Sequence, residues 1–378
     1  MCQMSRLLWS YAVSSLRKIL EDKLLATLVV ILLIFLTMDR RDISCTWFVR
    51  EARLGVLFSL AGLMASSNAL LGSGYPSRAV SKILSWPLRP WAMIALLSVF
   101  AGLLASVATN DASLFVSIPT AVLLSRGIGE AVEPAFTVAL VTAASNTGSA
   151  LTPIGNPQNM LLAREYGPGF ALFTTRMAPF TIGGLAIITG ASALLARKDI
   201  SAVRVPPPPA TSTRGLLAGL LGIVSVVWGL ETSRLVYGGL LGLLAAGLLY
   251  PSALLGVSLR LIVIIELFFL DFSLLSLHLA PLITGVSVSP IHSYLYGVLV
   301  SQVVSNVPAS VLLAGKTPYW LALSYGVNAG GILVVWGSLA NIIALRLSGV
   351  DAWRFQAYTL LIGFAVFVWG LLLVIVLC

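Results

Sequence analysis

The chain has 378 residues, of which 58% are hydrophobic and only 10% are charged. A soluble globular domain carries roughly 25% charged residues, and a disordered chain is polar and poor in aromatic residues, so this composition excludes both classes. The class that remains is a membrane protein with several spans. The net charge of +9 does not indicate nucleic acid, because Lys and Arg gather in cytoplasmic loops and near anionic lipids. We therefore expect a lipid bilayer as the surroundings and no nucleic-acid partner.

The first half of the chain predicts helices of unequal length. Residues 7–20 and 75–88 carry apolar side chains opposite a basic face, which is typical of helices that lie in the membrane interface. Spans are expected at residues 24–38, 54–71 and 179–196, with an amphipathic connector at 170–177. Residues 91–125 form two apolar limbs interrupted at Thr109-Asn110-Asp111. Residues 135–166 form a helix that halts at residues 145–148 and restarts near Gln158.

The second half repeats this pattern after a linker, residues 197–214, that contains four consecutive prolines. Spans are expected at residues 215–229, 236–249, 259–277 and 355–377. Residues 292–315 are interrupted at Ser305-Asn306, and residues 318–347 break at 327–330. The sequence therefore divides into a first repeat, 1–196, the linker, and a second repeat, 215–378.

The two interrupted helices match each other without gaps. Residues 145–159 (SNTGSALTPIGNPQN) align with residues 327–341 (VNAGGILVVWGSLAN) at a constant offset of 182. The identical pairs are Asn146/Asn328, Gly148/Gly330, Leu151/Leu333, Gly155/Gly337 and Asn159/Asn341. Of the eight asparagines in the chain, all except Asn68 lie in the interruptions. This pattern indicates an internal repeat with a shared polar function.

The distribution of positive charge predicts the topology. With a cytoplasmic N-terminus, and with residues 91–125 and 292–315 as re-entrant hairpins, fifteen of the 23 Lys and Arg lie on the cytoplasmic side and eight on the other. This agrees with the excess of positive charge in cytoplasmic loops. The first hairpin then opens from the cytoplasm and the second from outside, which is the inverted repeat common in secondary transporters. We expect a multi-pass protein of the cell membrane, either plasma or inner.

Interrupted helices at membrane depth predict a binding cavity. Non-helical backbone survives there only when it is buried in protein or lines a water-filled cavity. The N-termini of half-helices suit an anion, whereas unwound carbonyls suit Na⁺ or a proton carrier. Asp111 is the sharpest candidate, because a carboxylate at such depth is costly and marks function by default.

The quoted motifs resemble the ion transporter superfamily, which includes divalent anion/sodium symporters, citrate-transporter-like permeases, arsenite-efflux permeases and Na⁺/H⁺ antiporters. Residues 145–159 resemble its broken-helix signature, and residues 108–119 (ATNDASLFVSIP) its first hairpin tip, closest in style to the arsenite permeases. The resemblance implies an all-α protein with two inverted repeats, each with a re-entrant hairpin and a broken transmembrane helix. It also implies elevator-like movement and, in many members, a homodimer.

The resemblance implies substrate or ion contacts in both repeats, and the matched interruptions add two asparagines to them. The expected site residues are Asn110, Asp111, Ser145, Asn146, Thr147, Gly148, Asn159, Ser305, Asn306, Asn328, Gly330 and Asn341. Any Na⁺ site is expected near Asn110, Asp111 and Asn146. In the second repeat, valines 334 and 335 replace Thr152-Pro153, which argues against two equivalent Na⁺ sites.

The leading hypothesis is therefore a secondary active transporter of a small anion, coupled to H⁺ or Na⁺, with arsenite or a similar oxyanion as one candidate cargo. The alternative is a Na⁺/H⁺ antiporter of the same superfamily, in which Asp111 binds the cation. We expect no enzyme, since the chain offers no cluster of His and Glu and no Ser/His pair. The three cysteines and two histidines are too few and too scattered for a metal site, so no cofactor is expected. A channel or a subunit served by a partner ATPase stays open.

Overall fold

The computed structural model describes residues 23–38, 44–86, 88–128, 133–193, 209–279 and 284–378. These residues form helices and no strands. Six of the described helical segments are long and apolar enough to cross a membrane. The predicted all-α, multi-span fold is thus confirmed. The expected interfacial helix at residues 7–20 and most of the linker 197–214 lie outside the described residues.

The helices of the first half keep the predicted order and include one short helix, at Cys45–Glu51, that the sequence did not predict. They are α2 (Lys23–Met38), α3 (Cys45–Glu51), α4 (Leu54–Gly72), α5 (Tyr75–Leu84), α6 (Pro90–Val107), α7 (Asn110–Ile128), α8 (Pro134–Ser149), α9 (Pro157–Tyr166) and α10 (Gly169–Ala193). Helices α6 and α7 form the first hairpin, and α8 and α9 form the first broken helix. The connector expected at residues 170–177 is wrong, because these residues belong to the continuous helix α10.

The second half contains the corresponding elements. They are α11 (Thr213–Glu231), α12 (Leu235–Leu249), η2 (Pro251–Gly256), α13 (Leu259–His278), η3 (Thr284–Ser287), α15 (Pro290–Val304), α16 (Asn306–Leu313), α17 (Trp320–Leu333), η4 (Val335–Gly337), α18 (Leu339–Ser348) and α19 (Ala352–Leu377). Helices α15 and α16 form the second hairpin. The second broken helix consists of α17 and α18.

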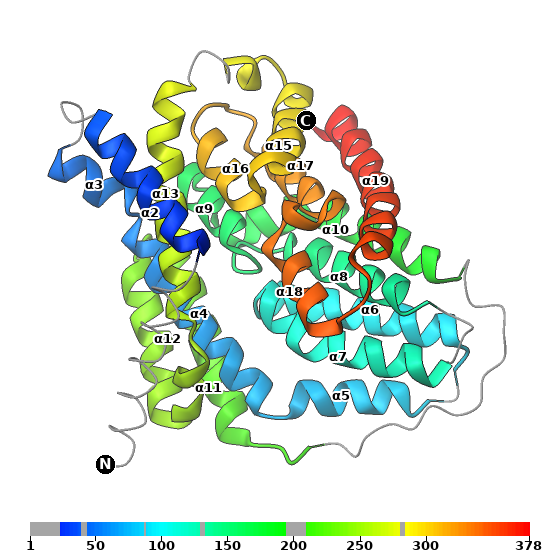
Figure 1. Ribbon diagram of the computed structural model, residues 1–378. Coiled ribbons are helices and arrows are strands. Elements are labelled where there is room, and N and C mark those ends of the chain that lie inside the picture. Colours follow the sequence, from blue (N-terminus) through cyan, green and yellow to red (C-terminus); the bar gives the residue numbers. More distant parts are fainter. Residues whose placement is uncertain (1–22, 39–43, 87, 129–132, 194–208, 280–283) are drawn as a thin grey trace.

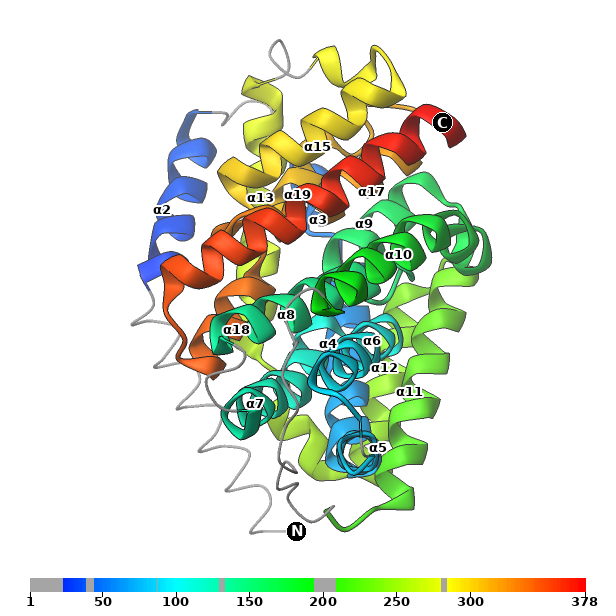
Figure 2. The same cartoon turned by 90° about the vertical axis from the view of Figure 1, so that its right-hand side faces the viewer.

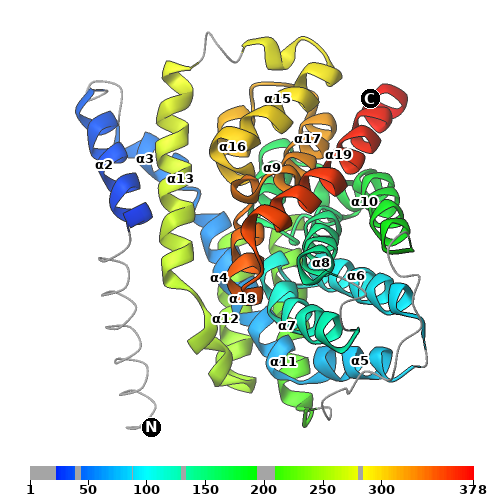
Figure 3. The same ribbon diagram turned by 45° about the vertical axis from the view of Figure 1, so that its right-hand side comes forward.

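The helices form two groups that lie side by side in Figures 1 and 3. The first group, here called the scaffold, consists of α2, α3, α4, α11, α12 and α13. The second group, here called the core group, contains both hairpins, both broken helices, α10 and α19. Helix α5 runs crosswise to α4 at the bottom of Figure 1. Within the scaffold, glycines allow α4 and α12 to touch: a Cβ on Gly62 would lie 2.4 Å from the carbonyl oxygen of Gly239, a close approach typical of membrane helices.

The core group repeats itself at the offset seen in the sequence. Helices α9 and α18 have the same length and begin 182 residues apart. Each ends in a left-handed glycine, Gly167 or Gly349, which is a common way to stop a helix. Each also carries an arginine in its last turn. Each is followed by a long helix, α10 or α19, and Figure 2 shows these two crossing the face of the core group.

The breaks lie about five residues later than the sequence predicts. Helix α8 continues through residues 145–148 to Ser149, and α17 continues to Leu333. In the first repeat Pro153 has no N–H to bond the carbonyl of Ser149, so the helix stops. In the second repeat the equivalent N–H, that of Val335, donates instead to Gln356 Oε1 at 2.8 Å. A proline in one repeat and a glutamine acceptor in the other therefore produce the same break.

Candidate functional site

Side-chain hydrogen bonds join the broken helices of the two repeats, and two of these bonds form a matched pair. Asn146 Nδ2 donates to Asn341 Oδ1 at 2.8 Å. Asn328 Nδ2 donates to Asn159 Oδ1, also at 2.8 Å. At the offset of 182 residues, each partner in the first bond is replaced by its equivalent in the second. This reciprocal exchange is what a two-fold relation between the repeats produces, and all four asparagines are buried.

The residues that begin α9 and α18 extend this pattern. Asn156 caps α9 and donates from Nδ2 to Asn328 Oδ1 at 3.1 Å. Ser338 caps α18 and donates from Oγ to Asn146 Oδ1 at 3.3 Å. These two caps are again 182 residues apart. The sequence analysis missed both as site residues, although their position just before each restarting helix is a signal that could have found them.

The amides of Asn159 and Asn341 close the two breaks. Asn159 Nδ2 lies 3.1–3.2 Å from the carbonyl oxygens of residues 149, 150 and 152. Asn341 Nδ2 lies 2.9 Å from the carbonyl oxygens of Gly331 and Val334. These carbonyls have lost their helical donors, and buried carbonyls without partners are costly. Each asparagine therefore stabilises its own break through Nδ2 and binds the other repeat through Oδ1.

The tip of the first hairpin is bonded tightly to this network. The backbone N–H of Asn110 donates to the carbonyl of Gly155 at 2.9 Å, and its Nδ2 donates to Asn146 Oδ1 at 2.8 Å. Ser145 Oγ donates to Asn110 Oδ1 at 2.7 Å. Hairpin and broken helix of the first repeat are thus joined through both backbone and side chains.

The tip of the second hairpin is bonded more loosely. Ser305 Oγ donates to the carbonyl of Gly337 at 3.2 Å. Gly337 is the equivalent of Gly155, but here a side-chain hydroxyl takes the place of the backbone N–H of Asn110. Among the described residues the amide of Asn306 has no hydrogen-bond partner, although this side chain is only 4% exposed. Its Nδ2 lies 2.6 Å from the place where Gly331 would carry a Cβ. Val327 stands where the first repeat has Ser145, so the hydroxyl that engages Asn110 has no equivalent here.

Asp111 lies in the first turn of α7, directly beside Asn110. The side chain is partly buried, and its carboxylate forms no hydrogen bond or ion pair with any described residue. The N-terminus of a helix favours negative charge, which offsets part of the cost of placing a carboxylate here. The equivalent residue of the second repeat is Val307, so the two hairpin tips differ in charge.

Three of the expected site residues face neighbouring helices instead of the network. Thr147 packs on α10: its carbonyl accepts from Thr181 Oγ1 at 3.3 Å, and its Cγ2 lies 2.7 Å from a Cβ built on Gly184. A Cβ on Gly148 would lie 2.1 Å from the carbonyl oxygen of Gly102 in α6. A Cβ on Gly330 would lie 2.7 Å from Ser301 Cβ in α15. These residues position the broken helices against the hairpins and α10.

The convergence of helix ends determines the electrostatics of the site. Helices α7, α9, α16 and α18 all begin here, and helix N-termini carry partial positive charge and free N–H groups. Asp111 is the only ionisable side chain among the twelve expected site residues. No group of His, Cys, Asp and Glu suited to a metal occurs among the described residues. The chemistry available is therefore amides, hydroxyls, helix dipoles and one carboxylate.

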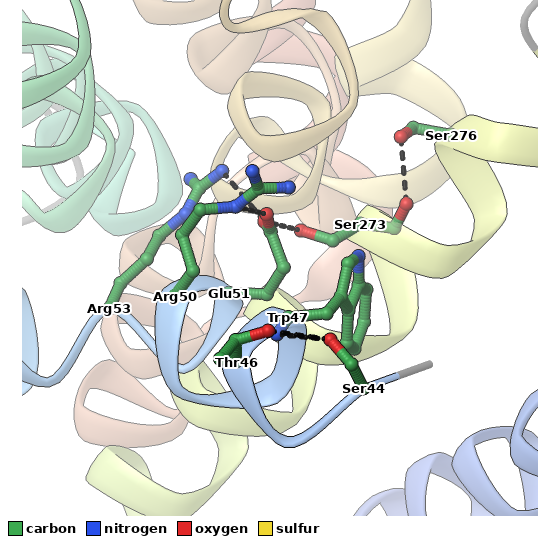
Figure 4. Close-up of polar contacts among 8 residues, drawn as sticks. All are labelled: Ser44, Thr46, Trp47, Arg50, Glu51, Arg53, Ser273 and Ser276. Carbon is green, nitrogen blue, oxygen red and sulfur yellow. Dashed lines mark hydrogen bonds and ion pairs between the residues drawn. The ribbon is translucent and has the colours of Figure 1, made fainter. Parts of the chain in front are cut away.

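A second polar cluster lies in the scaffold and joins α3 to α13 (Figure 4). Glu51 is its centre: Oε1 accepts from Arg50 Nε at 2.9 Å, and Oε2 accepts from Ser273 Oγ at 2.9 Å. Arg53 lies 3.6 Å from Glu51 Oε2, with its guanidinium over the ring of Phe269. The Glu51 carboxylate is thus engaged within the cluster, which indicates a structural role.

Comparison with known proteins identifies the relatives of this chain. The model of the citrate transporter family matches residues 18–316. Inner membrane protein YbiR of Escherichia coli is 31% identical over 326 residues, covering 80% of this chain and 83% of the relative. The uncharacterized transporter MJ0456 of Methanocaldococcus jannaschii is 31% identical over 329 residues, covering 84% and 87%.

A solved structure shares the fold. The YdaH transporter of Alcanivorax borkumensis, whose crystal structure revealed an unusual topology, superposes with a TM-score of 0.57 over 94% of this chain and 98% of that one. The sequence identity is 14%, so this likeness concerns the fold alone. The family match and the two relatives agree with the fold and with the resemblance of the broken-helix motifs, and the chain belongs to the citrate transporter family of membrane transporters.

Proposed function

We propose that this chain is a secondary active transporter, a permease, for a small anion, coupled to H⁺ or Na⁺. The observation that carries the proposal is the reciprocal asparagine network, in which each repeat completes the polar site of the other. A buried amide network of this size needs a purpose beyond stability, because apolar side chains would fill the same space without polar groups to satisfy. Four helix N-termini around the network favour an anion as the ligand.

The free amide of Asn306 supports a ligand position at the second hairpin tip. The amides of the network are already bonded to one another, whereas that of Asn306 takes no partner among the described residues. A small oxyanion or carboxylate would satisfy the Asn306 NH₂ group and the first N–H groups of α16. A bulky ligand is disfavoured, because Asn306 and its neighbours on α16 are buried.

Coupling is assigned to the first hairpin tip. Asp111 lacks a partner among the described residues. Oxygen atoms lie nearby, on the side chain of Asn110 in the same tip and on the carbonyl of Gly155 in the loop of the first broken helix, which bonds that tip. A proton or Na⁺ on Asp111 would remove a negative charge that repels the anion. Binding of the cation would therefore favour binding of the anion, which is the thermodynamic basis of symport.

The two groups of helices support an elevator-like movement. Both hairpins and both broken helices belong to the core group, and an apolar cluster that includes Leu60 and Phe269 of the scaffold and Ile154 and Val311 of the core group lies between the two. In our proposal the core group carries the site across the membrane against the scaffold. We place the N-terminus on the cytoplasmic side of the cell membrane, on the support of the charge distribution.

The test is thermal stabilisation of the purified protein by phosphate, arsenite, sulfate, citrate, Na⁺ and Li⁺ at two pH values. A ligand at one hundred times its Kd adds about 2.7 kcal/mol to the free energy of unfolding. We expect an anion to stabilise the protein, and Asn306→Leu to remove the effect. Asn68→Leu is the matched control, because Asn68 is the asparagine outside the interruptions and bonds Ala253 in the scaffold. Stabilisation by no anion would contradict the proposal.

A Na⁺/H⁺ antiporter is the second candidate, and one observation favours it: no Lys, Arg or His occurs among the expected site residues to balance a bound anion. Stabilisation by Na⁺ or Li⁺ alone, weaker at low pH and lost in Asp111→Asn, would support this function instead. An H⁺-coupled anion symporter would show the opposite dependence, with stronger anion binding at low pH.

A further inference from the structure

A surface groove of about 580 Å³ lies on the scaffold between α11 and α12, far along the chain from the polar network. It is lined by Trp228, Arg234, Tyr237, Leu240, Leu241 and Leu244. The two helices lie at the outer edge of the molecule in Figure 2. The groove therefore faces whatever surrounds the scaffold.

The groove exists because glycines bring the two helices close together. A Cβ on Gly229 would lie 2.9 Å from Gly238 Cα, and a Cβ on Gly222 would lie 3.4 Å from Gly242 Cα. With their backbones nearly touching, the helices direct their large side chains outward on both sides of the seam. The turn between them is closed by backbone bonds, including one of 2.7 Å from Arg234 N to the carbonyl of Gly229.

The chemistry of the groove changes along its length. Arg234 is exposed at the turn, and its guanidinium has no ion pair or hydrogen bond with any described residue. The nearest acid in the sequence, Glu231, is engaged elsewhere, because it accepts the backbone N–H of Phe170. Trp228 lies in the last helical turn of α11 and is 40% exposed, and Tyr237 lies in the first helical turn of α12 and is 63% exposed.

Beyond these aromatic rings the groove is purely aliphatic. Leu240, Leu241 and Leu244 follow one another down α12, and each is exposed. Along the groove, a cation is followed by aromatic rings and then by aliphatic side chains. This order matches one bilayer leaflet, in which anionic headgroups attract Arg and Lys and Trp and Tyr lie at the headgroup level.

We propose that this groove is a binding site for one anionic phospholipid. Arg234 binds the phosphate, Trp228 and Tyr237 border the glycerol region, and an acyl chain lies along the three leucines. The charge of Arg234 selects the occupant: a zwitterionic lipid offers it a phosphate whose charge is already balanced. The groove would hold this lipid as part of the scaffold surface, at a site independent of the transported ligand.

The test is native mass spectrometry of the full-length protein, titrated with phosphatidylglycerol or with phosphatidylcholine of the same acyl chains. We expect phosphatidylglycerol to bind about fivefold more tightly, as one basic residue near an anionic headgroup provides. Arg234→Gln should abolish this preference and Arg234→Lys should retain it. Leu241→Trp fills the groove and should weaken binding of both lipids.

Lys316→Gln is the matched control, because it removes an exposed cation between α16 and α17, away from the groove. It should leave the preference unchanged. The thermal midpoint of each variant in phosphatidylcholine shows whether it is folded. Equal binding of the two lipids by the parent protein, or a preference that survives Arg234→Gln, would overturn the proposal. A dimer that persists without lipid and dissociates in Leu241→Trp would assign the groove to a second copy of the chain instead.

Discussion

The two hairpin tips occupy matching positions beside the broken helices but differ in both backbone and side chains. Ser305 has a φ of 77°, in the left-handed region, whereas its equivalent Thr109 does not. The first tip carries Asp111 and is fixed by three hydrogen bonds through Asn110. The second tip has Val307 at the equivalent position and a free amide on Asn306. Each tip contacts the loop of its broken helix through a different group, the backbone N–H of Asn110 in the first and the Ser305 hydroxyl in the second. The first tip therefore carries the charge of the site, and the second carries an amide without a hydrogen-bond partner among the described residues.

The largest effect on transport is expected from Asp111→Asn, which removes the only carboxylate among the expected site residues. Transport into proteoliposomes should fall by at least ~10-fold, equivalent to about 1.4 kcal/mol, and the residual activity should lose its dependence on pH or Na⁺. Val307→Asn, which introduces the same side chain at the equivalent position of the other tip, should leave that dependence intact. An unchanged ion dependence in Asp111→Asn would remove this residue from coupling.

The largest effect on stability is expected in the asparagine network, in which the two repeats are alike. Asn146→Leu and Asn328→Leu should each lower the free energy of unfolding by ~3 kcal/mol or more. Each substitution leaves several buried polar groups without a hydrogen-bond partner, and each such group costs about 1–3 kcal/mol. Asn306→Leu breaks no bond among the described residues and should cost less than about 1 kcal/mol. Thermal midpoints in detergent measure all three. A loss of stability in Asn306→Leu as large as that in the other two variants would mean that the Asn306 amide is bonded after all.

Helix packing in the two repeats can be compared at Gly148 and Gly330. Gly148→Ala would place a Cβ against the backbone of α6, which cannot yield without moving the helix, and should cost about 1–3 kcal/mol or more. Gly330→Ala meets Ser301 Cβ at 2.7 Å and the Val298 carbonyl oxygen at 3.0 Å, which are longer than the 2.1 Å approach at Gly148, and should cost less. Gly190→Ala in α10 is the control, since nothing lies within 4 Å, and it should raise the thermal midpoint slightly. The reverse order of the first two would refute this packing.

The smallest effect is expected at Glu133, which links the start of α8 to α19. Hydrogen bonds from the Tyr358 hydroxyl and from Arg354 hold the pKa of the Glu133 carboxyl below its ordinary value of 4.5. Because this pKa is lowered in the folded state, the stabilisation is present above pH 4.5 and is lost as the pH falls through the folded-state value. Glu133→Gln should therefore lower the thermal midpoint slightly at pH 7, and the deficit should shrink as the pH falls below 4.5. A deficit that does not change with pH would exclude the ion pair as its cause.

The sequence predicts the number and order of the helices well, because apolar runs bounded by Gly, Pro and Asn define them. It also predicts the equivalence of Asn159 and Asn341, which the structure places at matching positions. The breaks themselves are predicted too early. Residues such as Asn146 and Gly148 are poor helix formers in water, yet a buried backbone at membrane depth stays helical until a carbonyl loses its donor, as at Pro153.

This shift explains why the site is predicted only in part. Once α8 continues to Ser149, consecutive residues point about 100° apart around the helix axis. Asn146 therefore faces the other repeat, while Thr147 faces α10 and Gly148 faces α6. The direction of a side chain depends on helical phase, and phase depends on where the helix ends. The crossing of the two broken helices, which brings Asn156 and Ser338 into the network, cannot be read from either segment alone.

The reciprocal bonding has a consequence for the origin and the design of this protein. Each repeat presents a donor and an acceptor in the same relative positions, Asn146 and Asn159 in the first repeat and Asn328 and Asn341 in the second. Two identical half-length chains with these residues would bond each other in the same way across a two-fold axis, as an isologous dimer. The present chain contains the equivalent of that interface inside a single polypeptide. In a protein built from two copies of one repeat, each asparagine donor would thus already have its acceptor in the other copy.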